Sequence, residues 1–283
     1  VQYTVFGRVA PDQKRKLVLA LKASGHTVAM VGDGVNDVPA LKVCDCAIAM
    51  AGGSDAAQKT SQVMLLAGNF SAIPQVILEG RRVINNITRS ASLFLVKTLF
   101  SFFLSLLTLL LPMSYPFRPI QMTLISVFTV GIPSFFLALE PNRERVKGGF
   151  LTTILENALP GALTNLLLIL VLFILSRPLG LSYGECSTIA VSAAGVTGIL
   201  ILAWTSRPLS LIRGLLIIAM AAGMIFTVFI FGSFFFLVPL TGSALWLALA
   251  LAALSPILYW LTRTAVERNV AAREARKRQS APS

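Results

Sequence analysis

Charged side chains are scarce in this sequence, and acidic ones are the scarcest. Of the 283 residues only 13% are Asp, Glu, Lys or Arg, whereas 55% are hydrophobic. A soluble domain of this length hides one core beneath a surface rich in polar groups, so this composition excludes a single soluble domain. The lipid bilayer is the expected environment for much of the chain.

Cysteine and histidine are nearly absent. The three cysteines, Cys44, Cys46 and Cys186, are too few and too scattered for a disulfide framework. The first part of the chain is therefore expected to lie in a reducing compartment. The 24 basic residues outnumber the 12 acidic ones. Because the basic residues gather at the ends of apolar runs, membrane topology explains them better than a nucleic-acid partner, and none is expected.

Long apolar runs recur throughout the chain after residue 90. A helix that crosses a bilayer needs about 20 consecutive, mostly apolar residues, and the runs are separated by short polar breaks. The pattern predicts an all-α polytopic membrane domain of six transmembrane helices over residues 76–262. The expected spans cover residues 91–111, 119–139, 158–175, 187–204, 211–231 and 244–261.

Basic residues favour alternate connections between these spans. They precede the first span, separate the second from the third, and flank the turn after the fourth: Arg81, Arg82, Arg89, Arg143, Arg145, Lys147, Arg207 and Arg213. Positively charged connections stay in the cytoplasm. Both termini, including a basic tail over residues 263–283, are therefore expected to be cytoplasmic in a multi-pass protein of the cell membrane. A lipid-headgroup regulatory segment is the alternative role for the tail.

Residues 1–75 alternate short apolar runs with helical stretches. Strands are expected at 4–6, 27–31, 46–50 and 63–66, and helices at 11–24, 36–42 and 55–61. Strand–helix alternation at this spacing predicts a parallel sheet of α/β type. A helix that starts near Ala72 has no strong breaker before the first apolar span. One long helix is therefore expected to join the soluble part to the membrane part.

The end of the second expected strand carries the candidate chemistry. Asp33 stands between two glycines, Gly32 and Gly34, and a second carboxylate, Asp37, follows at the start of a helix. Carboxylate oxygens at a strand end suit a hard cation such as Mg²⁺, and the glycines let the backbone approach a phosphate closely. Gly-Asp-Gly by itself is also common in surface turns.

A lysine upstream favours the chemical interpretation. Residues 6–14 read Phe-Gly-Arg-Val-Ala-Pro-Asp-Gln-Lys, which delivers Lys14 from the first turn of the preceding helix. A lysine, two carboxylates and a metal ion are typical catalytic groups of phosphoryl-transfer enzymes.

These segments resemble the P-type ATPases. That family has a Phe-x-Arg-x-x-Pro-x-x-Lys stretch, matched at residues 6–14, and a Gly-Asp-Gly-x-Asn-Asp-x-Pro-Ala-Leu hinge, matched at residues 32–41. The resemblance implies that Lys14 touches the transferred phosphate and that Asp33 binds Mg²⁺. It implies that Asn36 and Asp37 support the phosphate and the metal shell.

The resemblance also implies the fold and the missing partners. Residues 1–75 are expected to be the end of a cytoplasmic phosphorylation domain, a partial α/β domain of the haloacid dehalogenase type, and the spans to be the family's helices five to ten. The family's phosphorylated Asp-Lys-Thr-Gly-Thr sequence does not occur here. The chain is thus expected to need the N-terminal part of the same pump, whose domains make most of the contacts to ATP. Alone, it is expected to be inactive.

Polar side chains within the first two spans are candidates for the transport path, because such groups are costly in a bilayer. They are Lys97 and Ser101 in the first span and Ser126 and Thr129 in the second. Residues 131–133, Gly-Ile-Pro, are expected to break the second span and release backbone carbonyls. Close helix packing through small residues is the alternative role for the serines.

The run over residues 131–145 suggests the cargo. It resembles the bacterial branch called cation-transporting ATPase E, which implies a bacterial plasma membrane and calcium as the first candidate cation. Mg²⁺, Mn²⁺ and an organic cation such as a polyamine remain alternatives. A non-enzymatic membrane subunit with a degenerate phosphatase-like domain is the alternative from another class of protein. The intact set of Lys14, Asp33, Asn36 and Asp37 argues against that degeneracy.

Overall fold

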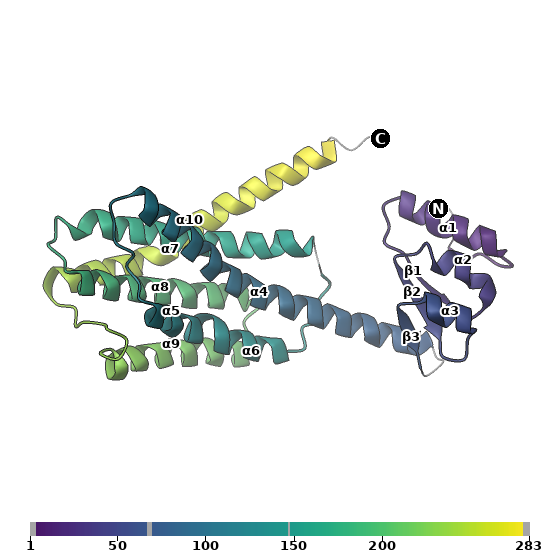
Figure 1. The fold of residues 1–283 in the computed structure, drawn as a ribbon, viewed down its shortest axis with the longest axis horizontal. Helices are drawn as coiled ribbons and strands as arrows, with labels where there is room; N and C mark the ends of the chain where they lie inside the picture. Colours follow the sequence, from purple (N-terminus) through teal and green to yellow (C-terminus); the bar gives the residue numbers. More distant parts are fainter. Residues whose placement is uncertain (1–3, 67–69, 147, 280–283) are drawn as a thin grey trace. The chain divides into compact units, whose positions relative to one another are not determined.

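The computed structural model describes residues 4–66, 70–146 and 148–279, and it divides into two compact units (Figure 1). The first unit is Val1–Gly80 and the second is Arg81–Ser283. Each unit has a hydrophobic core of its own.

The first unit is a small α/β layer. Its three strands, β1 (Ala29–Gly32), β2 (Cys46–Met50) and β3 (Val63–Leu65), pair in parallel in the order β1-β2-β3. The helices that alternate with them are α1 (Pro11–Ala23), the 3₁₀ turn η1 (Val35–Asp37) with α2 (Val38–Leu41), and α3 (Asp55–Thr60). Val18, Leu41 and Ala47 bring α1, α2 and β2 into one buried cluster. The predicted parallel α/β sheet is confirmed.

The strand predicted over residues 4–6 is wrong. These residues lie outside the sheet, and Val5 and Phe6 are 85% and 46% exposed. A β-branched run becomes a strand only where a neighbouring strand accepts its hydrogen bonds. The backbone here also turns at Arg8, whose φ of 52° ends any extended segment.

The second unit contains six helices long and apolar enough to cross a membrane among the described residues. The long α4 (Ile73–Leu110) starts in the first unit and continues into the second, as the sequence predicts. The elements that follow are α5 (Pro119–Ser126), η3 (Val127–Gly131), α6 (Ile132–Leu139), α7 (Phe150–Ser176), α8 (Tyr183–Thr205), α9 (Leu211–Phe231) and α10 (Gly242–Gln279). The predicted all-α membrane domain of six helices is confirmed.

The break predicted at residues 131–133 takes another form. The chain stays helical from α5 to α6, and η3 between them is a single π-helical turn. Pro133 lacks an N–H and its ring would clash with a carbonyl one turn earlier. The wider π turn accommodates that ring, and such turns are frequent at functional sites.

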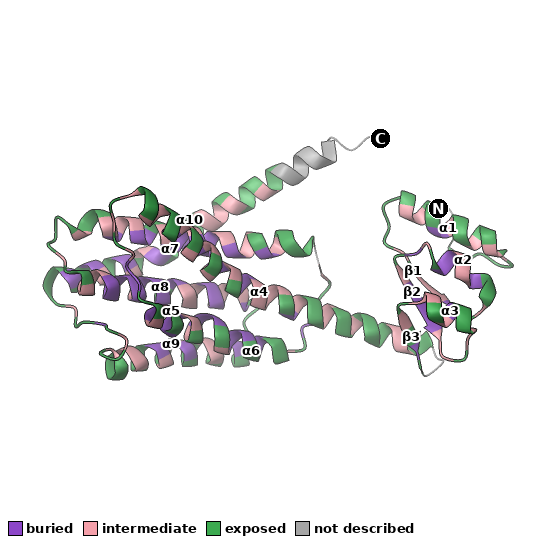
Figure 2. Cartoon of the chain, viewed as in Figure 1, coloured by how far each residue is buried: buried purple, intermediate pink, exposed green. Residues whose placement is uncertain are grey.

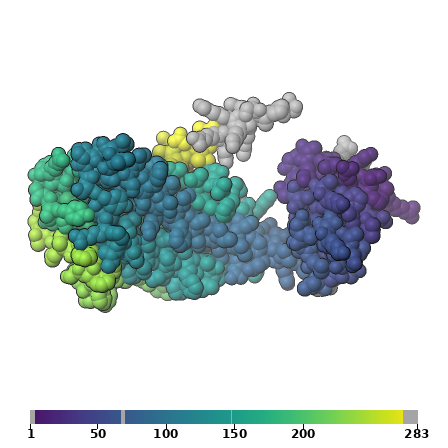
Figure 3. Space-filling model, in the orientation of Figure 1, coloured from purple at the N-terminus to yellow at the C-terminus, as the bar shows by residue number. Residues whose placement is uncertain are grey.

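Buried residues face the interior of the helical unit, and exposed apolar residues face outward (Figure 2). The helices α7, α8 and α10 pack against one another, with Leu168, Ile189 and Leu251 in one core cluster. Outward residues such as Phe229 and Trp246 are 84% and 73% exposed, as expected of side chains that meet lipid. Side chains fill the spaces between the helices on the face that Figure 3 shows.

Candidate functional site

The candidate phosphoryl-transfer site lies where β1 ends. The chain leaves β1 at Gly32, passes Asp33 and enters η1, which ends at Asp37. Gly32 is required here because a Cβ at this position would lie 2.6 Å from the Cβ of Asp37. The loop is also tied to the start of α3, since the Ser54 N–H donates to the Asp33 carbonyl at 2.6 Å. Backbone geometry therefore fixes the positions from which the Asp33 and Asp37 side chains extend.

Lys14 and Asp37 form an ion pair at this site. The Lys14 Nζ lies 2.7 Å from Asp37 Oδ1, and the Asp33 and Gly34 N–H groups donate to Asp37 Oδ2 at 3.3 and 3.4 Å. Burial alone would raise the pKa of Asp37, but the Lys14 ammonium and the backbone donors outweigh it and hold the pKa below its ordinary value. Asp37 is thus ionised at neutral pH and orients the lysine.

The other predicted residues of this site are more open to solvent. Asp33 and Asn36 are both exposed, and Gly34 is half-buried. An exposed carboxylate fits a hard cation such as Mg²⁺. The nearby Lys14 ammonium fits the phosphate to which that cation is bound. Among the described residues no group of three acidic, histidine or cysteine side chains could hold a metal. Asp33 would therefore be one ligand of several, with the others coming from water, phosphate or the rest of a longer protein.

The predicted transport residues divide into two groups. Lys97 and Thr129 line one cavity in the second unit, although they come from α4 and the π turn. Thr129 is held there because α8 approaches closely: a Cβ on Gly198 would lie 2.5 Å from the Thr129 methyl carbon. Ser101 and Ser126 are half-buried and lie outside the described lining of this cavity. The Ser126 hydroxyl donates to its own helix at the Met122 carbonyl.

Asn165, on α7, lines the same cavity and is not among the residues predicted from the sequence. It is only 6% exposed. An amide inside a mostly apolar span was the signal that could have identified it.

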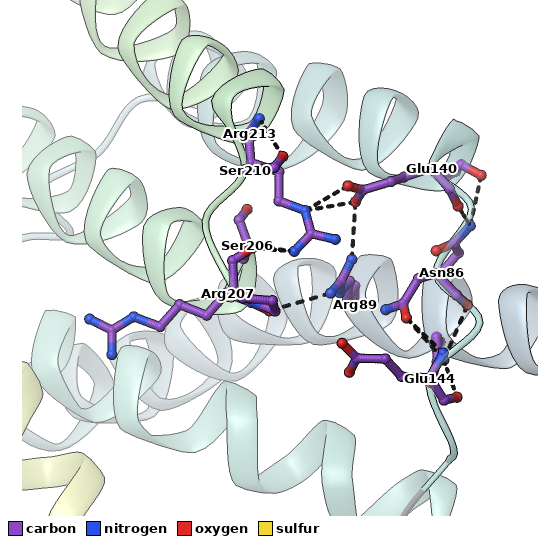
Figure 4. A network of polar contacts seen from close by, with 12 residues as sticks. Asn86, Arg89, Glu140, Glu144, Ser206, Arg207, Ser210 and Arg213 are labelled. Atoms are coloured by element: carbon purple, nitrogen blue, oxygen red, sulfur yellow. Dashed lines mark hydrogen bonds and ion pairs between the residues drawn. The ribbon is translucent and has the colours of Figure 1, made fainter.

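A polar network joins α4 to the ends of three other segments (Figure 4). Glu140, directly after α6, accepts from Arg213 Nε at 2.7 and 2.9 Å and from Arg89 at 3.2 Å. Arg213 also donates to the carbonyl of Ser206, which follows α8, at 3.0 Å. Asn86 donates to the Ala138 and Glu140 carbonyls at 2.9 Å each. These bonds satisfy carbonyls that helix ends leave unpaired, so the network fixes how these segments meet.

Comparisons with known proteins identify similar chains among cation-transporting ATPases. Residues 1–45 match the family of haloacid dehalogenase-like hydrolases. The chain is 40% identical over 278 residues to the calcium-transporting ATPase CtpE of Mycolicibacterium smegmatis, covering 91% of this chain and 35% of that protein. It is 49% identical over 168 residues to CtpE of Mycobacterium bovis, covering 56% of this chain and 21% of that protein.

A similar protein also occurs in Streptococcus pneumoniae. The chain is 39% identical over 231 residues to the probable cation-transporting ATPase exp7 of Streptococcus pneumoniae, covering 79% of this chain and 30% of that protein. The chain therefore spans about a third or less of the length of these relatives.

Proposed function

Because the chain belongs to the P-type ATPases, we propose that it forms the C-terminal portion of an ATP-driven cation pump. In such a pump, formation and hydrolysis of an aspartyl phosphate drive cation transport. The observation that carries the proposal is the 2.7 Å pair of Lys14 and Asp37 beside the exposed Asp33. This arrangement keeps one positive and one free negative group at a strand end, where a phosphoryl group and its metal ion can be held.

Each residue of this site has a distinct proposed role. Asp37 orients the Lys14 ammonium, which neutralises charge on the transferred phosphoryl group. Asp33 holds Mg²⁺, with Asn36 and Asp37 supporting the phosphate and the metal shell. Mg²⁺ supplies, when bound, the positive charge that phosphoryl transfer requires. ATP is bound mainly by parts of the pump outside this chain.

The chain is a multi-pass membrane protein. We propose that both of its ends face the cytoplasm of a bacterium, because the basic connections alternate along the chain. The phosphoryl-transfer residues then lie on the cytoplasmic side, where ATP is available.

The transported cation is proposed to be Ca²⁺, the cation in the names of the CtpE relatives. Mg²⁺, Mn²⁺ or an organic cation is the alternative cargo. The proposed path includes Lys97, Ser101, Ser126 and Thr129. The cavity shared by Lys97 and Thr129 supports it, and Lys97 would act there as a built-in counter-charge that an arriving cation displaces.

The test is phosphoenzyme formation from labelled ATP in the full-length protein that contains this chain. Asp33→Asn should abolish labelling, because the metal ion loses the carboxylate that balances its charge. Lys14→Ala should weaken it, because the phosphate charge is left less well neutralised. Asp12→Asn on the same helix as Lys14 is a matched control at an exposed position and should label normally. Normal labelling of Asp33→Asn would refute the proposal and favour a non-enzymatic membrane subunit.

A further inference from the structure

The cavity that Lys97 and Thr129 share has a third polar lining residue, Asn165. Its volume of about 30 Å³ is enough for roughly one water molecule or one ammonium group. Lys97 comes from α4, Thr129 from the π turn and Asn165 from α7, and the other described lining residues are apolar. The cavity thus brings three polar side chains together among apolar ones.

Asn165 lacks the hydrogen bond that its burial demands. Its amide oxygen has no donor among the described residues, although the residue is 6% exposed. Leaving such an oxygen unpaired is costly. Thr129 is not the donor, because its hydroxyl donates to the Ile125 carbonyl at 2.8 Å. Of the described lining residues, Lys97 is the remaining one with a strong donor for this oxygen.

Lys97 needs a hydrogen-bond acceptor, as the Asn165 oxygen needs a donor. Its half-buried side chain forms no ion pair among the described residues, and an ammonium within an apolar span is costly without acceptors. The described lining contains no carboxylate. A site with neutral oxygens alone suits one positive charge better than two, so it fits the lysine head group better than a bare divalent ion.

We propose that Asn165 is the acceptor that holds the Lys97 ammonium in this cavity when no cation is bound, with Thr129 Oγ1 as the second acceptor. The inference rests on the proposed function, since it assigns the resting place of the counter-charge. The four-carbon stem of lysine is flexible enough to move its head group in and out. An arriving cation competes with the tethered ammonium, so the strength of the Asn165 contact sets how much cation is needed. Asn165 is therefore a positioning residue that acts through Lys97.

The test measures Ca²⁺-stimulated ATP hydrolysis by the full-length protein in vesicles as the Ca²⁺ concentration is varied. Asn165→Leu removes the acceptor at similar volume. It should lower the half-maximal Ca²⁺ concentration by about tenfold, the effect expected from loss of a hydrogen bond to a charged group. Asn165→Asp should raise that concentration, because a carboxylate holds the ammonium more tightly. This second variant preserves the side-chain shape and gives the answer if the leucine variant fails to fold.

Dependence on Lys97 separates this role from a packing role. In a Lys97→Ala background, Asn165→Leu should cause no further shift. Thr164→Val is the matched control: Thr164 is the preceding residue of α7, fully buried, and bonds Pro160 and Thr262 instead of lining the cavity. It should leave the Ca²⁺ dependence unchanged.

The opposite results would overturn the inference. A higher Ca²⁺ requirement in Asn165→Leu, with a lower one in Asn165→Asp, would mean that Asn165 binds the cation itself. An equal shift with and without Lys97 would assign Asn165 to packing. If the wild type shows Ca²⁺-stimulated hydrolysis and neither Asn165 variant shifts its half-maximal Ca²⁺ concentration, the acceptor role of Asn165 is refuted and the proposed function is not. Absence of Ca²⁺-stimulated hydrolysis in the wild type would refute the proposed function and this inference with it.

Discussion

Replacing Glu140 by glutamine should destabilise the membrane unit. The Glu140 carboxylate lies between two guanidinium groups, those of Arg89 and Arg213, whose side chains are each 11% exposed. The substitution preserves the shape of the side chain and removes its charge. Two largely desolvated cations are then left close to each other without the carboxylate that they share.

The expected loss follows from the burial of the three groups. Removing one partner of a fully buried ion pair costs about 3–5 kcal/mol. The Glu140 side chain is 24% exposed, so water compensates part of the loss. Arg213 also keeps its bond to the Ser206 carbonyl at 3.0 Å. We therefore expect a loss of about 3 kcal/mol, the lower end of the range.

The measurement is denaturant unfolding of the detergent-solubilised protein, followed by tryptophan fluorescence. Trp204 is a local probe, because the Arg207 guanidinium stacks 3.7 Å above its ring near the network. Glu144→Gln is the matched control at an exposed carboxylate and should change stability by less than about 0.5 kcal/mol. A double-mutant cycle with Arg213→Met should give a coupling energy of about 1–3 kcal/mol. Additive losses, or equal stability of Glu140→Gln and the control, would refute the reasoning.

Three other predictions test the topology, the phosphoryl-transfer site and the transport path. In a cysteine-free background, a membrane-impermeant thiol reagent should label Arg145→Cys and Ser182→Cys from opposite faces; labelling from one face would contradict the six-span topology. Because the pKa of Asp37 is lower in the folded protein, its pair with Lys14 should protect α1 from hydrogen exchange, relative to Lys14→Met, above about pH 4. That difference should shrink as the pH falls through the folded-state pKa, and a difference that grows toward acid would be contrary to the assignment. Lys97→Ala should leave nucleotide binding intact but change the cation dependence of ATP hydrolysis, adding turnover without cation to the Ca²⁺-stimulated component; unchanged dependence would identify Lys97 as a snorkelling residue.

The local order of the chain could be predicted from the sequence because it depends on near neighbours. The α/β alternation of residues 1–75 and the six apolar runs each follow from short-range patterns, and the structure contains both. The motif around Asp33 could also be predicted, since all its residues lie within one short stretch, residues 32–41. The strand expected at residues 4–6 failed because a strand needs a distant partner that a local pattern does not reveal.

Only the tertiary structure could decide which distant residues meet. Glu140 and Arg213 are 73 positions apart and touch because the end of α6 meets the start of α9. Asn165 shares a cavity with Lys97 because α7, α4 and the π turn all contribute residues to its lining. Hydrophobic periodicity specifies that a helix buries one face, but many pairings of helices bury similar apolar area. Side-chain fit and the need to satisfy buried polar groups select among those pairings, and both are properties of the assembled helices.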